Sequence, residues 1–344
     1  MAEYAYLSTP DPEIAEDLRV MSENQDGPMD NTILREYLSN VLSADLRKAL
    51  ESELPSESKY DVKDFMFDTG DGSGAKVLAR NIVPAKSAPD EKFPLFFWIH
   101  GGGWVAGDVN MDDPMLRIIC ANLRISVVNC EYRLSPEHVF PTALNDCYAV
   151  LKHVAGNPDQ FSASLEKGFI IGGASAGGNL SAALALRLRD DPFFKEKPLT
   201  GQSLIIPMVI HPDAYSELPE EYRSQLLSME QNKNAPGSSK ESVYKLLTDY
   251  QGPPKDPYMS PLLADSHKGL PPAFIQVAGL DPLRDEAFVY EKVLNKNGVS
   301  TKLIAYPGVP HSGWYIFATK EVGKKWRKDW QDGIQWLLGF SSKN

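Results

Sequence analysis

A serine flanked by glycines is the most informative group of residues in this chain. Gly173-Ala174-Ser175-Ala176-Gly177 follows the apolar run 168–172 and precedes a stretch of strong helix formers. In a G-x-S-x-G turn between a strand and a helix, the serine takes a strained conformation that exposes its hydroxyl, and the glycines permit close approach of the chain. The helix that follows points free N–H groups at a reacting carbonyl. Ser175 is therefore a candidate nucleophile for acyl transfer, and the alternative is an ordinary glycine-rich loop.

A second glycine-rich stretch, His100-Gly101-Gly102-Gly103-Trp104, directly follows the apolar run 94–99. Backbone N–H donors in such a stretch can stabilise the negative charge of a tetrahedral intermediate, and losing one donor costs about 3–4 kcal/mol. A further donor is expected from Ala176, the residue after the serine. A flexible turn or a phosphate loop is the alternative, but the stretch lacks the Lys-Ser/Thr ending and the spacing of phosphate-binding motifs. We expect His100 to brace the glycines by hydrogen bonding.

The general base of this chemistry must be a histidine. The six candidates are His100, His138, His153, His211, His267 and His311. His311 follows the last predicted strand, in a loop interrupted by Pro307, Gly308 and Pro310. Such a loop is where enzymes with this nucleophile turn keep their base, so His311 is the predicted base.

The acid that orients the base is expected between the serine and the histidine in chain order. Asp281 stands directly after the apolar strand 272–278, and Asp285 lies one turn further along. A loop at a strand end faces the site, whereas a helix interior usually does not, which favours Asp281. An Asp before Pro282 is also a common helix start, so a purely structural cap remains an alternative reading of Asp281.

These residues lie within a chain that alternates predicted strands and helices. The strand candidates are 61–67, 76–83, 94–99, 125–131, 168–173, 202–209, 272–278 and 300–305. The helix candidates are 111–122, 141–155, 176–190, 282–297 and 324–338. Several strands are continuous apolar runs, which predicts a mostly parallel sheet covered by helices on both faces.

Two further segments look helical and divide the chain. We expect an N-terminal helical part at 1–55, in which 32–54 places apolar residues on one face, and a helical insertion at 211–265 with helices over 217–230 and 238–250. The core would then be 56–210 and 266–344. We interpret both helical segments as a cap over the active site. The alternative is that the insertion merely covers the sheet edge.

Charge and composition exclude several classes of function. A formal net charge of −11 repels phosphate backbones, so nucleic acid is not an expected partner. No apolar run is long enough to span a membrane, and the first residues lack the pattern of a secretory signal. Three cysteines, Cys120, Cys130 and Cys147, fit no metal pattern and favour a reduced, cytoplasmic setting.

Taken together, the motifs resemble the hormone-sensitive-lipase family of α/β-hydrolases, with a further similarity to fungal members. The matching stretches are His100-Gly101-Gly102-Gly103-Trp104, Tyr132-Arg133-Leu134-Ser135-Pro136-Glu137, Gly173-Ala174-Ser175-Ala176-Gly177-Gly178-Asn179 and Asp281-Pro282-Leu283. The resemblance implies an α/β-hydrolase fold with an eight-stranded sheet and a helical cap. It further implies a triad of Ser175, Asp281 and His311, with an oxyanion hole formed by the amides of Gly102, Gly103 and Ala176. The family often has Asp before the nucleophile, where this chain has Ala174, a departure that concerns substrate or subfamily.

The sequence thus predicts a serine esterase that acts on a small-molecule ester, as a monomer or a homodimer. This chemistry requires no metal or organic cofactor. The same triad could instead serve an acyltransferase, a cyclase or a thioesterase-like enzyme of a secondary-metabolite pathway. A non-catalytic binder is a further alternative, since the plant gibberellin receptors resemble this family but lack its catalytic histidine. The presence of His311 argues against that alternative.

Overall fold

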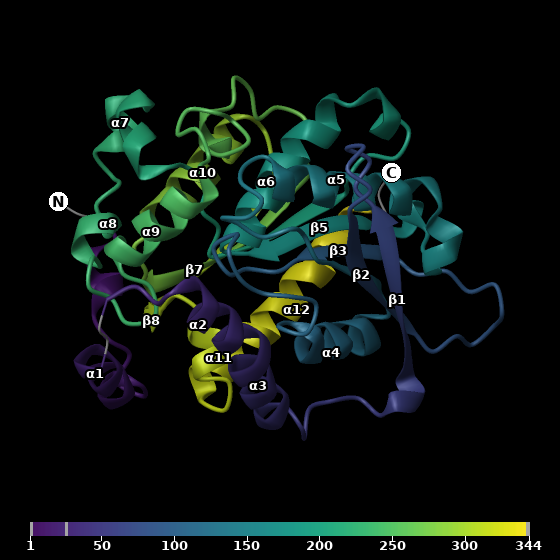
Figure 1. Ribbon diagram of the computed structural model, residues 1–344, viewed down its shortest axis with the longest axis horizontal. Coiled ribbons are helices and arrows are strands. Elements are labelled where there is room, and N and C mark those ends of the chain that lie inside the picture. The colour runs from purple at the N-terminus through teal and green to yellow at the C-terminus, as the bar shows by residue number, and fades with distance from the viewer. Residues whose placement is uncertain (1–2, 25–26, 342–344) are drawn as a thin grey trace.

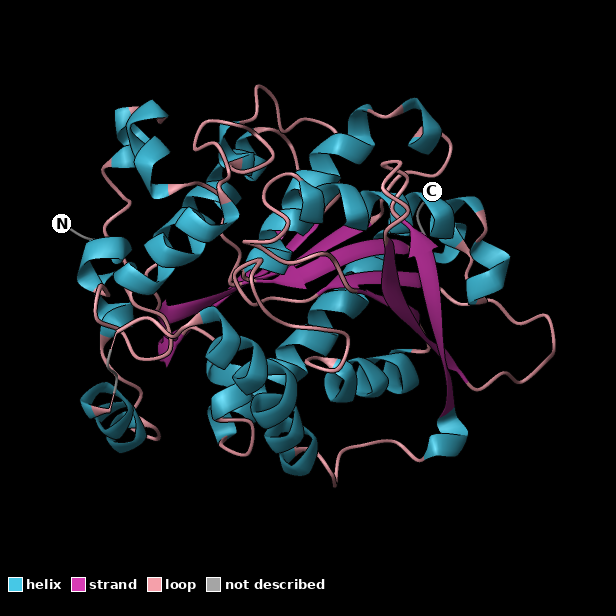
Figure 2. Ribbon diagram, in the orientation of Figure 1, coloured by secondary structure: helices cyan, strands magenta, loops and turns pink. Residues whose placement is uncertain are grey.

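An eight-stranded sheet crosses the centre of the molecule, with helices packed on both of its faces (Figures 1 and 2). The computed structural model describes residues 3–24 and 27–341. The strands are β1 (Tyr60–Asp68), β2 (Lys76–Pro84), β3 (Leu95–Ile99), β4 (Ser126–Cys130), β5 (Phe169–Ala174), β6 (Gly201–Ile205), β7 (Ala273–Leu280) and β8 (Thr301–Pro310).

The strand order is β1-β2-β4-β3-β5-β6-β7-β8. The β1–β2 and β2–β4 pairs are antiparallel, and all the other pairs are parallel. The prediction of a mostly parallel, eight-stranded sheet is therefore confirmed. Every residue of β3, β4 and β5 is buried, which is the reason that these strands read as unbroken apolar runs.

Two groups of helices cover the sheet. The helices are α1 (Ala15–Glu23), α2 (Asn31–Glu36), α3 (Ser43–Ala49), α4 (Asp113–Leu123), α5 (Thr142–Gly156), α6 (Ala176–Asp190), α7 (Glu220–Arg223), α8 (Ser228–Gln231), α9 (Lys240–Tyr250), α10 (Arg284–Lys296), α11 (Gly313–Ile316) and α12 (Glu321–Ser341). Apolar side chains of α5, α6 and α10 pack on one face of the sheet, and those of α4 and α12 pack on the other. Among the described residues, no helix is both long enough and apolar enough to span a bilayer.

The N-terminal helical segment is broken rather than continuous. The stretch predicted as one helix over 32–54 consists of α2, a π-helical turn over Tyr37–Leu42 and α3. Leu38, Leu42 and Leu46 belong to the same buried apolar cluster as residues of α4, so the expected apolar face exists although the helix is irregular. An amphipathic pattern reports which face is buried, and a local π turn keeps that face without changing the pattern.

Two other predictions need correction. The run 202–209 is not one strand, because β6 ends at Ile205 and Ile206 adopts a positive φ of 41°. The remainder of the run is buried beneath the insertion, so its apolar character reflects burial without strand pairing. Within the insertion, the expected helix over 217–230 is reduced to two single turns, α7 and α8, whereas the helix over 238–250 is present as α9.

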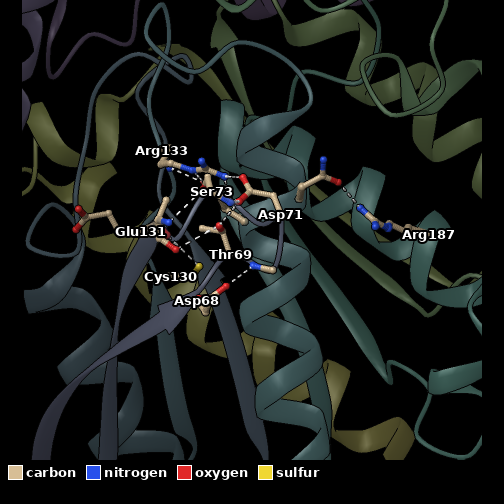
Figure 3. Close-up of polar contacts among 12 residues, drawn as sticks. Asp68, Thr69, Asp71, Ser73, Cys130, Glu131, Arg133 and Arg187 are labelled. Atoms are coloured by element: carbon tan, nitrogen blue, oxygen red, sulfur yellow. Dashed lines mark hydrogen bonds and ion pairs between the residues drawn. The ribbon is translucent and has the colours of Figure 1, made fainter.

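The turn between β1 and β2 is tied to the segment after β4, as Figure 3 shows. Asp71 accepts a hydrogen bond from Arg133 Nη2 at 2.7 Å and one from Thr69 Oγ1 at 2.9 Å. The same Arg133 pairs with the buried Asp146 of α5. Arg133 therefore joins a hairpin, a loop and a helix, which gives this residue of the Tyr132–Glu137 motif a structural role.

Candidate active site

Ser175 occupies the tight turn between β5 and α6. Its backbone has φ 55° and ψ −115°, a strained conformation that costs about 1–3 kcal/mol. A Cβ at Gly173 would collide with the carbonyl of Gly177, and one at Gly177 would collide with the carbonyl of Ile99. The glycines are thus required by close packing of the backbone around the turn. As the sequence predicted, the serine stands between a buried strand and a helix.

Three side chains from distant parts of the chain form a hydrogen-bonded row. Nε2 of His311 lies 2.9 Å from Oγ of Ser175, and Nδ1 of the same ring lies 2.7 Å from Oδ2 of Asp281. The other carboxylate oxygen, Oδ1, accepts a hydrogen bond from the amide of Leu283 at 2.9 Å. Oδ1 of Asp281 therefore caps the turn before α10, and Oδ2 faces the imidazole. Such a row can hold a histidine in the tautomer that accepts a serine proton.

Asp285 points in a different direction. Its Oδ2 accepts hydrogen bonds from the amides of Leu227 and Ser228, and its Oδ1 pairs with Arg284. Among the described residues, no hydrogen bond joins Asp285 to His311. Asp285 instead fixes the start of α8 to the start of α10.

The loop that carries Asp281 is held by residues of the insertion. Asn232 Nδ2 donates to the backbone carbonyl of Asp281 at 2.9 Å, and Ser228 Oγ donates to that of Pro282 at 2.7 Å. Sequence reasoning missed both residues, because neither belongs to a motif and each lies about 50 positions before its partner. Their contacts arise only when the insertion folds back onto the end of β7.

The backbone amides predicted for the oxyanion lie beside this row. Gly102 and Gly103 have positive φ values of 101° and 61°, and no described residue accepts a hydrogen bond from their amides. Ala176 opens α6, so its amide belongs to the first turn, which has no partner within the helix. All three residues border the same cavity as Ser175 and His311.

His100 supports the glycine loop, which consists of residues 101–103. Its Nδ1 lies 2.7 Å from the carbonyl of Gly101, and the hydroxyl of Tyr132 donates to the carbonyl of His100 at 3.2 Å. Complete burial lowers the pKa of His100 to about 4, so the ring is neutral at pH 7. The contact agrees with the predicted bracing role of this histidine.

The cavity above Ser175 has a volume of about 330 Å³. Its walls combine residues of the N-terminal helices, the insertion and the loops at the strand ends. Most of the lining is apolar, including Leu34, Tyr37, Leu38, Leu42, Met111, Val243, Leu246, Trp314, Tyr315 and Ile316. Among the described lining residues, Lys245 alone carries a full charge, and it is paired with Asp249 at 2.8 Å. Within 3–24 and 27–341, no group of three His, Cys, Asp or Glu side chains could hold a metal ion.

Comparison with known proteins gives consistent matches. Residues 96–315 match the family model of the alpha/beta hydrolase fold. An AB hydrolase superfamily protein of Schizosaccharomyces pombe is 37% identical over 306 residues, which cover 88% of each chain. A versiconal hemiacetal acetate esterase of Dothistroma septosporum is 37% identical over 250 residues, 71% of this chain and 74% of that protein. The crystal structure of vibralactone cyclase has 39% identity and a TM-score of 0.92, and the match covers 98% of this chain and 97% of that chain.

Proposed function

Because the chain belongs to the hormone-sensitive-lipase family of α/β-hydrolases, we propose that it is a serine hydrolase that cleaves carboxylic esters. The observation that carries this proposal is the row of hydrogen bonds from Asp281 through His311 to Ser175. The free amides beside the serine support it, because they are where the developing oxyanion needs donors.

The reaction proceeds in two halves. His311 Nε2 takes the proton of Ser175 while the hydroxyl oxygen attacks the ester carbonyl, and the amides of Gly102, Gly103 and Ala176 bind the oxyanion. The intermediate collapses to an acyl-enzyme when His311 gives its proton to the leaving alkoxide. Water then loses a proton to His311 and attacks the acyl group, and the acid departs as Ser175 regains its proton. Asp281 remains ionised and stabilises the imidazolium that forms in each half.

The apolar lining of the cavity favours an uncharged ester with an apolar acyl or alcohol group. Segments 1–55 and 211–265 together act as the cap, since residues of both contribute to its walls. A volume of about 330 Å³ suits a small molecule, at the lower end of typical ligand sites.

Replacement of the serine tests the proposal directly. We expect Ser175→Ala to lower kcat for a short 4-nitrophenyl ester by about 10⁴-fold or more, as in other serine hydrolases. Ser181→Ala is the matched control, because Ser181 is buried in α6, which follows Ser175, and its hydroxyl makes no hydrogen bond with a described residue. Full turnover by the Ser175→Ala variant would refute the assignment.

Analysis of the products identifies the acyl acceptor. With water as the acceptor, the free acid accumulates at the same rate with or without an added alcohol. An acyltransferase would form a new ester in the presence of the alcohol, and a cyclase would convert a hydroxy-acyl substrate into a lactone. Either product in excess over the acid would overturn the hydrolytic reading while leaving the triad intact.

A further inference from the structure

Asp112 is a buried carboxylate that the reaction described above does not use. Its side chain is 1% exposed, and its residue stands at the N-cap position of α4 without capping that helix. One oxygen, Oδ2, accepts a hydrogen bond from Trp98 Nε1 at 2.7 Å. The other, Oδ1, accepts a short hydrogen bond from the hydroxyl of Tyr315. The carboxylate therefore joins two aromatic side chains that come from different parts of the chain.

Both aromatic residues lie next to the candidate site. Trp98 is in β3, two positions before the loop that begins at His100. Tyr315 is in α11, four positions after His311, and its ring borders the substrate cavity. Asp112 thus connects the strand that leads into the glycine loop with the helix that follows the histidine.

Burial of this carboxylate is costly, and the hydrogen bonds from Trp98 and Tyr315 offset that cost only in part. Among the described residues, no cation forms an ion pair with Asp112, and burial raises its pKa to about 6. The neighbouring Asp113 faces Arg80 and Arg117 instead. A capping Ser or Asn at this position would start α4 without the cost of a buried charge.

Four tryptophans near the cavity pack against one another in pairs without a contribution from the carboxylate. Trp98 contacts Trp330 with ring centroids 4.8 Å apart, and Trp314 stacks on Trp326 at 5.2 Å. Aromatic pairs can pack in more than one geometry, whereas a hydrogen bond to a fixed oxygen sets the direction of its donor. The carboxylate of Asp112 therefore fixes the orientation of the Trp98 ring among aromatic side chains that already pack against one another.

We propose that Asp112 and Tyr315 act as a positioning pair. The pair fixes one wall of the cavity above Ser175 and keeps the loop that carries His311 in a constant position relative to the glycine loop. This inference rests on the proposed ester hydrolysis. An error of about 1 Å in the position of a catalytic group can cost up to about 100-fold in rate. Loss of the pair should therefore lower kcat more than it alters KM for a short ester.

The test uses Tyr315→Phe, Asp112→Asn and the double variant in the full-length enzyme. For a short 4-nitrophenyl ester, each single variant should lower kcat by about 10-fold or more with KM changed less than about threefold. Because the two residues act as a unit, the double variant should be no slower than the slower single variant. The matched control is Tyr306→Phe, since Tyr306 is also a buried tyrosine that donates to a carboxylate, that of Asp329, but does not line the cavity.

The outcomes separate the pair from the reaction itself. Three outcomes would overturn the proposed pair. The first is a wild-type kcat in Tyr315→Phe, and the second is an equal loss of kcat in Tyr315→Phe and Tyr306→Phe. The third is a double variant in which the losses of the two single variants multiply. Should Asp112→Asn not fold, the comparison of Tyr315→Phe with Tyr306→Phe decides alone. Ser175→Ala is measured in parallel, and activity that survives in it would contradict the proposed function rather than the pair.

Discussion

Asp281 and Asp285 are separated by a single helical turn, yet they contact different parts of the molecule. Asp281→Asn should lower kcat by about 10³–10⁴-fold, because an amide in place of the carboxylate favours the wrong histidine tautomer. Asp285→Asn should instead lower the melting temperature, since the buried Arg284 loses its partner. Steady-state kinetics and thermal unfolding of both variants check this division. A larger loss of kcat in Asp285→Asn than in Asp281→Asn would contradict the assignment of the acid.

The buried carboxylate of Asp112 should make the free energy of unfolding depend on pH. Its pKa of about 6 lies above the ~3.9 expected in the unfolded chain, so between these values the folded protein holds a proton that the unfolded chain has lost. The free energy of unfolding contributed by this group is therefore present below pH ~4 and is lost as pH rises through ~6. The full change is on the order of 3 kcal/mol.

Urea unfolding of wild type and Asp112→Asn between pH 4 and 8 measures this contribution. The stability of the variant relative to wild type should increase from about pH 4 and level off above about pH 7, one unit beyond the pKa of Asp112. His100, whose low pKa gives a contribution of opposite sign, is present in both proteins and cancels from the difference. Parallel stability curves would show that Asp112 titrates normally.

The side chains that sequence could identify are those whose chemistry requires a local pattern. Ser175 is recognisable because its turn needs glycines on both sides, and His311 because prolines and a glycine mark its loop. Asp112 and Asn232 carry no such pattern. The partner of Asp112 through Oδ1 is 203 positions away, so the contact depends on the start of α4 and α11 meeting in the folded chain. Only the folded structure brings such pairs together.

Arg35 connects the N-terminal helices to the loop that carries the glycines. Its guanidinium donates to the carbonyl of Val105 at 2.7 Å and to that of Ser135 at 2.9 Å, and it pairs with Glu137. α2 also contacts α9, where Asn31 donates to Asp249 at 2.9 Å. These contacts join both parts of the proposed cap to each other and to the core.

Removal of the Arg35 anchor should loosen one wall of the cavity. We expect Arg35→Ala to raise KM for a medium-chain ester by about three- to tenfold, because Leu34 and Leu38 on the same segment line the cavity. Arg19→Ala is the control, since the ion pairs that Arg19 forms with described residues are exposed and lie within α1. Equal KM values in the two variants would argue that the N-terminal helices do not shape the substrate site.

The ends of helices and strands were harder to predict from the sequence than the sides that they bury. Alternation of apolar strands and helices identified the parallel sheet, because both faces of its central strands must be buried. The same apolar signal extended β6 as far as 209, since burial beneath the insertion produces the same residue types as burial in a sheet. The break of the 32–54 helix by a π turn has no counterpart in the pattern, because Leu38, Leu42 and Leu46 remain on the buried face.

The protein carries a formal net charge of −11, which should influence the choice among esters. Long-range repulsion lowers the rate at which an anionic ligand reaches a negatively charged protein, and added salt screens it. Locally, the charge of Lys245 beside the cavity is offset by Asp249, so no free cation among the described lining residues opposes that repulsion. We therefore expect a hemisuccinate ester to have a lower kcat/KM than a neutral ester of equal chain length.

The salt dependence of kcat/KM for the two esters distinguishes long-range electrostatic repulsion from selection by the shape of the cavity. Between 10 and 150 mM NaCl, kcat/KM for the anionic ester should rise by about two- to fivefold, while that of the neutral ester should stay nearly constant. A carboxylate rejected only because it does not fit an apolar wall would remain a poor substrate at every salt concentration. An anionic ester preferred at low salt would instead mean that Lys245 leaves Asp249 and binds the substrate, and Lys245→Met would then abolish the preference.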